Sequence, residues 1–296
     1  MTAATGVSHL GASPGRGLRK AKSSIATVTI VGAFVVALIP LALIIGYVIF
    51  RGASVINADF LTGEIAYSPR SPSGGIGPAI VGTLLITGAA TALAVPLGVL
   101  GGIWIHEYGA GSRLAAFVRF LADVMTGVPS IVMGLFIYTF IVLNTKQTNG
   151  FAGALALACL MLPVVIRTTE EMLRLVPDEQ REASMALGSR KARTIMRVVL
   201  PAATPGIVSG ALLAVARAAG ETAPLLFVIG FTFTTNSSLF TGGNTALPVQ
   251  IYGNAASAFE AAQDRAWGAA LTLIVLVFLF TIAARIVSAL FVRKQG

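Results

Sequence analysis

Six stretches of the chain carry no Asp, Glu, Lys or Arg, and shorter polar segments separate them. Each is close to or above the roughly 20 residues that a helix needs to cross about 30 Å of hydrocarbon. Lipid offers no partner for an open backbone N–H or C=O group, so a segment that crosses it is helical. The pattern predicts an all-α integral membrane protein with six transmembrane helices, over residues of about 25–50, 79–105, 117–143, 151–166, 201–229 and 267–292.

The charged residues assign the predicted loops to the two sides of the membrane. The formal net charge is +9, with 21 Lys and Arg against 12 Asp and Glu. If the N-terminus is cytoplasmic, both ends and the second and fourth loops lie inside, and they hold most of the basic residues. Arg217 lies within a span, and the outer loops hold only Arg51, Arg70, Lys146 and Arg265. This asymmetry follows the positive-inside rule and predicts that both termini are cytoplasmic. The basic charge therefore indicates membrane insertion and no nucleic-acid partner.

The N-terminal segment and one charged loop lie outside the six predicted spans. Residues 1–24 are rich in Gly, Ser, Ala and basic residues, which predicts a flexible cytoplasmic tail. The apolar run that follows is too long for a signal-peptide core and has no obvious cleavage site, so we interpret it as a retained first span. Residues 25–296 then form one transmembrane domain. Its only long charged segment is the predicted cytoplasmic loop 167–200.

This loop has the pattern of two short amphipathic helices joined by a corner. Pro177 and Asp178 can open the first helix, since Asp accepts hydrogen bonds from first-turn N–H groups. Gly188 can leave that helix in the left-handed conformation at little steric cost. Pro201 is expected to end the second helix at the membrane surface. The pattern alone is also typical of interfacial helices that lie on anionic lipid.

Within the loop, the EAA signature of bacterial ABC import permeases is resembled by Glu182-Ala183-Ser184, Gly188 after three further residues, and Val198-Val199-Leu200-Pro201 after nine more. The sequence departs from that signature at Ser184 and Val198, both conservative in size. Other stretches resemble PstA-type phosphate permeases, which belong to the inner membrane components of binding-protein-dependent transport systems. These stretches are residues 74–84, 96–98, 107–108, 127–130, 216–224 and 247–252. The resemblance covers roughly residues 25–290.

The resemblance implies the permease fold of type I ABC importers in the bacterial cytoplasmic (inner) membrane, and the import of inorganic phosphate by alternating access. In that family the loop forms the coupling helix that enters a groove of the ATPase. The resemblance gives this coupling role to Glu182, Ala183, Ser184, Gly188, Leu200 and Pro201. The implied partners are a second, PstC-type permease subunit, two PstB-type subunits that bind ATP and Mg, an external PstS-type phosphate-binding protein and the lipid bilayer.

Arg217 and Glu221 form the charged pair inside the predicted fifth span. They are four residues apart, hence on one helix face, and an ionised side chain is costly in a bilayer. Gly206, Gly210 and Ala214 lie within about 60° of Arg217, which predicts that this face packs on protein rather than lipid. One interpretation is an ion pair that only fixes helix packing. The other is that Arg217 donates two hydrogen bonds to phosphate in transit, while Glu221 orients the anion and moderates the charge.

Three residues of the predicted third span are weaker candidates for the substrate pathway. Asp123 follows Arg119 by four residues, which is more typical of a local ion pair or a helix-end group. Thr126 and Ser130 lie further into the span and could offer hydroxyl groups, although packing explains both more simply.

Several kinds of site are missing from the sequence. No G-x-x-x-x-G-K-[ST] phosphate loop occurs, so the chain itself is not expected to bind ATP. A single cysteine, Cys159, and the lack of a His/Cys cluster predict no internal disulfide and no metal site. We therefore expect a chain that is not an enzyme by itself and binds no cofactor. The alternatives are a permease for another oxyanion, such as molybdate or sulfate, and an ATP-independent channel or secondary transporter, which would not need the EAA-like loop.

Overall fold

The structure, a computed structural model, describes residues 16–293, and every regular element within them is helical, as predicted. The chain divides into two compact units, Met1–Phe50 and Arg51–Gly296. The elements are α1 (Arg16–Ala53), α2 (Ala58–Thr62), α3 (Gly77–Ile103), η1 (Trp104–Tyr108), α4 (Arg113–Gly127), α5 (Ser130–Ile137), η2 (Tyr138–Val142), α6 (Leu143–Thr145), α7 (Gly150–Arg174), α8 (Asp178–Ala186), α9 (Lys191–Thr194), η3 (Ile195–Val199), α10 (Leu200–Ala219), α11 (Leu225–Val228), α12 (Leu247–Ala255) and α13 (Glu260–Arg293).

The first unit holds α1 as far as Phe50. Its apolar run is long enough to cross a membrane, and the hydroxyls of Thr27 and Thr29 donate to carbonyls one turn earlier, which satisfies these polar groups inside the helix. The sequence predicted a flexible tail over residues 1–24. Residues 1–15 lie outside the described residues, but 16–24 already belong to α1. Leu, Arg, Lys and Ala in this segment are good helix formers, so the helix begins before the apolar run does.

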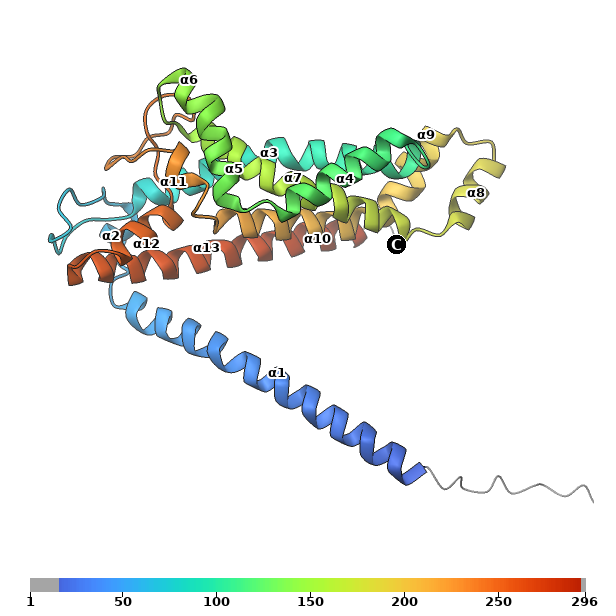
Figure 1. The fold of residues 1–296 in the computed structure, drawn as a ribbon, viewed down its shortest axis with the longest axis horizontal. Coiled ribbons are helices and arrows are strands. Elements are labelled where there is room, and N and C mark those ends of the chain that lie inside the picture. The colour runs from blue at the N-terminus through green and yellow to red at the C-terminus, as the bar shows by residue number, and fades with distance from the viewer. Residues whose placement is uncertain (1–15, 294–296) are drawn as a thin grey trace, which may run out of the picture. The chain divides into compact units, whose positions relative to one another are not determined.

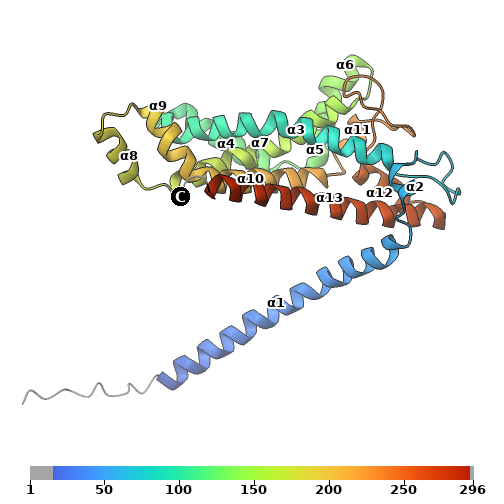
Figure 2. The same ribbon diagram turned by 180° about the vertical axis from the view of Figure 1, so that it is seen from behind.

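In the second unit, the long helices α3, α7, α10 and α13 run side by side (Figure 1 and, from behind, Figure 2). The short helices α8 and α9 lie at one end of this bundle, and α2, α6, α11 and α12 lie at the other. Glycines bring α3 close to α7: a Cβ on Gly98 would lie 2.7 Å from the Val165 side chain, and one on Gly102 would lie 2.6 Å from that of Thr169. Small residues allow membrane helices to approach in this way.

The predicted third span, 117–143, is a broken helix and not a straight one. Its two parts, Arg113–Gly127 and Ser130–Thr145, are bent by 105°. The break follows from Pro129, which has no N–H to donate and which holds Val128 in an extended conformation at φ −72° and ψ 127°. Among the described residues, five helices could therefore span a membrane, or six if this bent pair is one span.

The predicted limits of the fourth and fifth spans also need correction. α7 continues past residue 166 to Arg174, and α9, η3 and α10 form one helical run over Lys191–Ala219. Pro201 does not end a helix, because it lies in the first turn of α10, directly after the π-helical turn η3. The i to i+5 bonds of a π-turn accommodate the missing proline N–H. The run ends well before 229, since the chain turns at 220–224 and α11 is a separate short helix.

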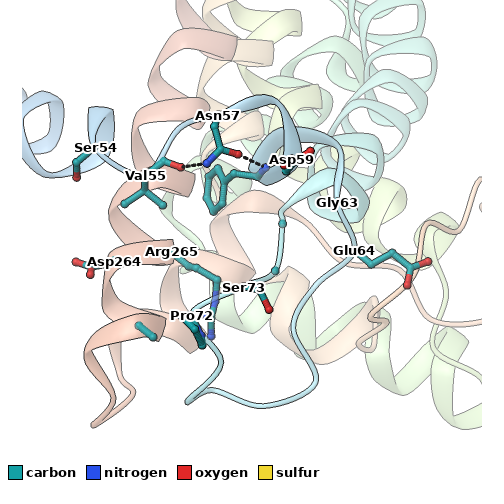
Figure 3. Close-up of a pocket in the computed structure, with 14 residues that line it drawn as sticks. Ser54, Val55, Asn57, Asp59, Gly63, Glu64, Pro72, Ser73, Asp264 and Arg265 are labelled. Atoms are coloured by element: carbon teal, nitrogen blue, oxygen red, sulfur yellow. Dashed lines mark hydrogen bonds between the residues drawn. The ribbon is translucent and has the colours of Figure 1, made fainter.

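At the other end of the bundle, a loop segment is fixed to α13 by Arg265. This arginine is 5% exposed, and it donates to the carbonyls of Ser71 and Pro69, the latter at 3.1 Å. Beside it lies a pocket of about 660 Å³ between α2, the glycine-rich loop and α13 (Figure 3). Asp59, Glu64 and Asp264 line the pocket together with Arg265. The three carboxylates outnumber the one arginine, so the lining of this pocket is acidic overall and does not suit an anion.

Candidate functional site

A cavity of about 230 Å³ lies among α4, α5, α7 and α10 in the second unit. It brings together four of the residues that the sequence singled out for a substrate pathway, Arg217, Glu221, Thr126 and Ser130. The complete lining is Met125, Thr126, Val128, Pro129, Ser130, Leu160, Met161, Val164, Ala214, Arg217, Ala218 and Glu221. Charged and hydroxyl groups thus share one hollow with the apolar side chains of α7.

Two interruptions of helical structure meet at this cavity. One is the break between α4 and α5 at Val128 and Pro129, and the other is the turn 220–224 between α10 and α11. They are in direct contact, because a Cβ on Gly134 of α5 would lie 2.5 Å from the Cα of Pro224. Broken helices at a cavity expose backbone N–H and C=O groups that a continuous helix would use internally.

Arg217 is the most open charged group of the cavity. Its Nε lies 3.6 Å from Oε1 of Glu221, and the two side chains are 75% and 21% exposed. This separation is longer than a hydrogen bond, so the guanidinium keeps its donors for another partner. Glu221 does not continue the helix as the sequence suggested, because α10 ends at Ala219. The pair therefore spans the end of α10 and the turn that follows it.

The stripe of small residues on α10, Gly206 and Gly210, packs on protein as expected, but the Arg217 side chain does not. A Cβ on Gly206 would collide with Met172, and one on Gly210 would collide with Thr168, so the stripe lies directly on α7. Arg217, further along the same helix, was expected to point into protein. Within this chain its side chain is 75% exposed, although Leu160, Met161 and Val164 of α7 line the same cavity.

Asp123 lies outside the cavity lining, and its ion pair differs from the one that the sequence suggested. Its carboxylate pairs with Arg167 of α7, whereas Arg119 donates to Glu170 at 2.6 Å. Both pairs join α4 to α7. Thr126 lines the cavity, but its hydroxyl donates to the Asp123 carbonyl at 2.7 Å within its own helix. Among the described residues, the half-buried Ser130 hydroxyl has no hydrogen-bond partner, so it is the freer of the two.

The second candidate region lies at the end of the bundle that carries α8 and α9 (Figure 1). We call residues 175–194 the coupling loop, after the role that the resemblance implies; they are the part of the predicted loop 167–200 that holds α8 and α9. Gly188 forms its corner in the left-handed conformation, at φ +83°, as predicted. Ser184 of α8 and Thr194 of α9 share a hydrogen bond of 2.9 Å across this corner, which holds the two helices together.

The residues that resemble the EAA signature fall into two groups. Glu182, Ala183 and Gly188 are exposed, and the neighbouring Leu187 is 89% exposed, so α8 presents an open surface. Ser184 is half-buried at the junction with α9. Leu200 and Pro201 are half-buried in α10, away from the corner. The exposed group is therefore the more accessible one for a partner protein.

Sequence reasoning missed one charged contact that positions the coupling loop. Arg181 of α8 donates to Glu107 of η1 at 3.0 Å, and their side chains are 13% and 6% exposed. The two residues are 74 positions apart, so no helical spacing could pair them. The only sequence signal for this contact was that Glu107 and Arg181 both lie in loops predicted on the cytoplasmic side of the membrane. Within residues 16–293, no group of three or more His, Cys, Asp or Glu is placed to hold a metal ion.

Comparison with known proteins adds a family and a fold. Residues 94–295 match the family described as binding-protein-dependent transport system inner membrane component. The chain is 45% identical over 280 residues to the phosphate transport system permease protein PstA 1 of Mycobacterium tuberculosis (strain CDC 1551 / Oshkosh), a match that covers 94% of this chain and 92% of the relative.

Solved structures of ABC transporters have the same fold at low sequence identity. One is a bacterial ABC transporter involved in the import of the acidic polysaccharide alginate, with a TM-score of 0.62 and 16% identity over 91% of this chain and 98% of that chain. Another is the MetNI methionine ABC transporter in inward-facing conformations, with a TM-score of 0.57 and 20% identity over 73% of this chain and 94% of that chain. The architecture is therefore that of type I ABC importer permeases.

Proposed function

Because the chain belongs to the family of binding-protein-dependent transport system inner membrane components, we propose that it is the PstA-type permease subunit of an ATP-driven phosphate importer. A relative that is 45% identical over nearly the whole chain and is named a phosphate transport permease supports phosphate as the substrate. The family and the apolar helices support a multi-pass protein of the bacterial inner membrane. The distribution of basic residues supports cytoplasmic termini.

The observation that carries the substrate pathway is the open guanidinium of Arg217 in a cavity between two helix breaks. Arginine suits an oxyanion, because its planar fork donates two parallel hydrogen bonds to neighbouring oxygens. The cavity of about 230 Å³ also has room for a small hydrated anion, since water occupies roughly 30 Å³ per molecule. Phosphate would bind there with part of its hydration shell.

The start of α5 supports the same assignment. Ser130 is the first residue of α5 and lines the cavity together with Arg217, so this helix begins at the wall of the cavity. The positive end of a helix dipole favours an anion, and discontinuous membrane helices use their N-termini in this way. The Ser130 hydroxyl can donate a further hydrogen bond. Thr126 contributes its oxygen, and Asp123 remains with Arg167 outside the binding set.

Glu221 has a separate part in this proposal. It lies 3.6 Å from Arg217, close enough to lower the local positive potential but too far to engage the guanidinium in a good hydrogen bond. An arginine without such a neighbour would hold the anion more tightly. Glu221 therefore keeps the affinity low enough for phosphate to leave.

Energy would come from partner subunits that contact the coupling loop. The exposed face of α8, with Glu182, Ala183 and the corner at Gly188, would enter a groove of a PstB-type ATPase, two copies of which bind ATP and Mg. A PstC-type permease would complete the membrane part and cover the exposed side of Arg217. A PstS-type protein would deliver phosphate from outside. ATP binding would open the permease pair outward, and hydrolysis would return it to the inward-facing state.

The test is uptake of radiolabelled phosphate by proteoliposomes that hold the purified complex and binding protein. We expect uptake that depends on ATP, and we expect Arg217→Ala to lower it about tenfold to a hundredfold, since hydrogen bonds to charged groups are worth about 1.5–3 kcal/mol. Arg217→Lys should retain part of the activity. The control is Arg197→Ala, which removes an exposed arginine of the same helical run.

Three results would each contradict a part of the proposal. Phosphate flux through this chain without any ATPase would indicate a channel or a secondary transporter. ATP-dependent uptake of molybdate or sulfate in preference to phosphate would keep the importer but change its substrate. Normal phosphate uptake by Arg217→Ala would leave the importer in place and remove Arg217 from the pathway.

A further inference from the structure

One arginine of the coupling loop contacts three neighbouring segments through a single guanidinium. Nη2 of Arg181 donates to the Glu107 carboxylate of η1 at 3.0 Å and to the Leu173 carbonyl of α7 at 2.8 Å. Nη1 donates to the carbonyl of Val176 and to the Asp178 carboxylate, the latter at 3.0 Å. The five N–H donors of arginine have a fixed planar geometry, so these partners are held in fixed mutual positions.

The contact to Leu173 completes the end of α7. The last carbonyls of a helix have no partner within it, and Leu173 lies in the final turn of α7. The Val176 N–H donates to this carbonyl at 3.3 Å, and Arg181 supplies a second, shorter donor from α8. Its positive charge lies at the negative end of the helix dipole. α8 is therefore fastened to α7 as well as to η1.

The other helix of the coupling loop is fastened to the same residue of η1. The Lys191 ammonium at the start of α9 donates to the backbone carbonyl of Glu107, and it lies 5.1 Å from the ring centre of Tyr108. α8 thus holds the Glu107 side chain while α9 holds its backbone. A displacement of the loop cannot occur without moving η1 or breaking these bonds.

η1 and α7 both lead toward the cavity. η1 directly continues α3, and α3 packs on α7 through the close approaches at Gly98 and Gly102. α7 then supplies Leu160, Met161 and Val164 to the cavity wall. The Arg181 guanidinium is therefore a junction between the coupling loop and the two helices that form and support this wall.

We propose that Arg181 is the positioning residue that transmits displacement of α8 to α3 and α7, and thereby to the substrate cavity. The inference rests on the proposed function, which supplies the ATPase that moves α8. Without the guanidinium, the exposed face of α8 would still dock on the ATPase, but its movement would no longer be passed to the membrane helices. ATP hydrolysis would then continue with less transport.

The experiment compares two substitutions with a matched control in the reconstituted complex. Arg181→Lys keeps the charge but loses the planar fork, and Arg181→Gln loses both. The control Arg174→Gln removes an arginine from the last turn of α7 that is 72% exposed and pairs with Glu170 at 3.9 Å. The quantity measured is phosphate transported per ATP hydrolysed. We expect this ratio to fall about tenfold in both Arg181 variants, within the usual range of coupling between sites, and to be unchanged in the control.

The same samples report assembly and basal ATP hydrolysis, which we expect to remain near the wild-type values in Arg181→Lys. If Arg181→Gln fails to assemble, Glu107→Gln takes its place, because it removes the carboxylate charge at nearly constant size. A wild-type ratio in Arg181→Lys together with Glu107→Gln would overturn the inference.

A second readout does not depend on phosphate. In the wild-type complex, a non-hydrolysable ATP analogue should change amide hydrogen exchange in residues 104–108 and 170–176 as well as in α8. In Arg181→Lys the change should remain confined to α8. An equal response of both proteins would refute the role of Arg181, whereas a wild-type complex that moves no phosphate would refute the proposed function instead.

Discussion

Gly134 of α5 lies against the backbone of Pro224, and a Cβ on Gly134 would be 2.5 Å from the Pro224 Cα and 2.7 Å from its carbonyl oxygen. This contact joins the broken helix α4–α5 to the turn between α10 and α11. Both breaks line the cavity that holds Arg217. The geometry of the proposed substrate site therefore depends on the absence of a side chain at position 134.

The first prediction is that Gly134→Ala destabilises the protein and reduces phosphate uptake. The colliding atoms belong to backbone, which cannot turn aside as a flexible side chain could, so we expect a loss of about 1–3 kcal/mol. Thermal unfolding of the detergent-purified complex measures it. Gly88→Ala in α3 is the control, because a Cβ there meets nothing within 4 Å. Equal melting temperatures for the two variants would contradict the close approach.

The second prediction concerns the corner of the coupling loop. Gly188→Ala places a side chain at φ +83°, where the left-handed conformation costs roughly 1–2 kcal/mol, although a Cβ there meets nothing within 4 Å. We expect Gly188→Ala to weaken phosphate-stimulated ATP hydrolysis. Gly111→Ala is a matched control outside the loop, since Gly111 has φ +78° and equal space. A similar loss of ATP hydrolysis in both variants would mean that strain alone, and not the corner, is responsible.

The third prediction tests a buried hydrogen bond that connects α3 to α12. The Thr83 hydroxyl accepts from the Leu247 N–H at 2.8 Å, and Thr83 is 2% exposed. Thr83→Val keeps the shape but leaves this buried N–H without a partner, which costs about 1–3 kcal/mol. Thr91→Val should be near neutral, because its hydroxyl bonds only within its own helix. Thermal unfolding of the purified complex again measures the change in stability. An unchanged melting temperature for Thr83→Val would argue against this hydrogen bond.

The fourth prediction follows from the separation of Arg217 and Glu221. Glu221→Gln removes the charge that moderates Arg217, so phosphate should bind more tightly and leave more slowly. Because Arg217 is 75% exposed, the pair is worth at most about 1 kcal/mol, which is less than about tenfold in KM. Initial rates of uptake should give a lower KM together with a lower maximal rate. A raised KM would mean that Glu221 itself helps to bind the substrate.

The patterns of apolar, small and charged residues were enough to locate most of the helices and part of the candidate site. Uncharged runs predicted an all-helical membrane protein, and Gly188 was correctly identified as a corner because few other residues adopt a positive φ easily. Arg217 and Glu221 were identified because charges are costly in a bilayer. The small residues Gly206 and Gly210 predicted a close helix contact, which α7 provides.

The same local rules misplaced several boundaries. Pro129 and Pro201 have similar apolar surroundings, yet Pro129 ends a helix in a 105° bend and Pro201 lies within a helical run. The difference arises because a π-turn precedes Pro201, whereas the turn at Pro224 packs against the helix that follows Pro129. The few residues next to each proline in the sequence predict neither the π-turn before Pro201 nor the packing of the Pro224 turn.

The helical, membrane-spanning character of the chain follows from its amino-acid sequence alone, because it depends on runs of side chains whose transfer free energies add along the segment. Which charges meet depends instead on tertiary packing. Asp123 pairs with Arg167 instead of Arg119, and Arg181 reaches Glu107 across 74 positions. Ion pairs of this kind are set by how helices distant in sequence pack together, because charge attraction depends on separation in space and the spacing of residues along one helix does not fix that separation.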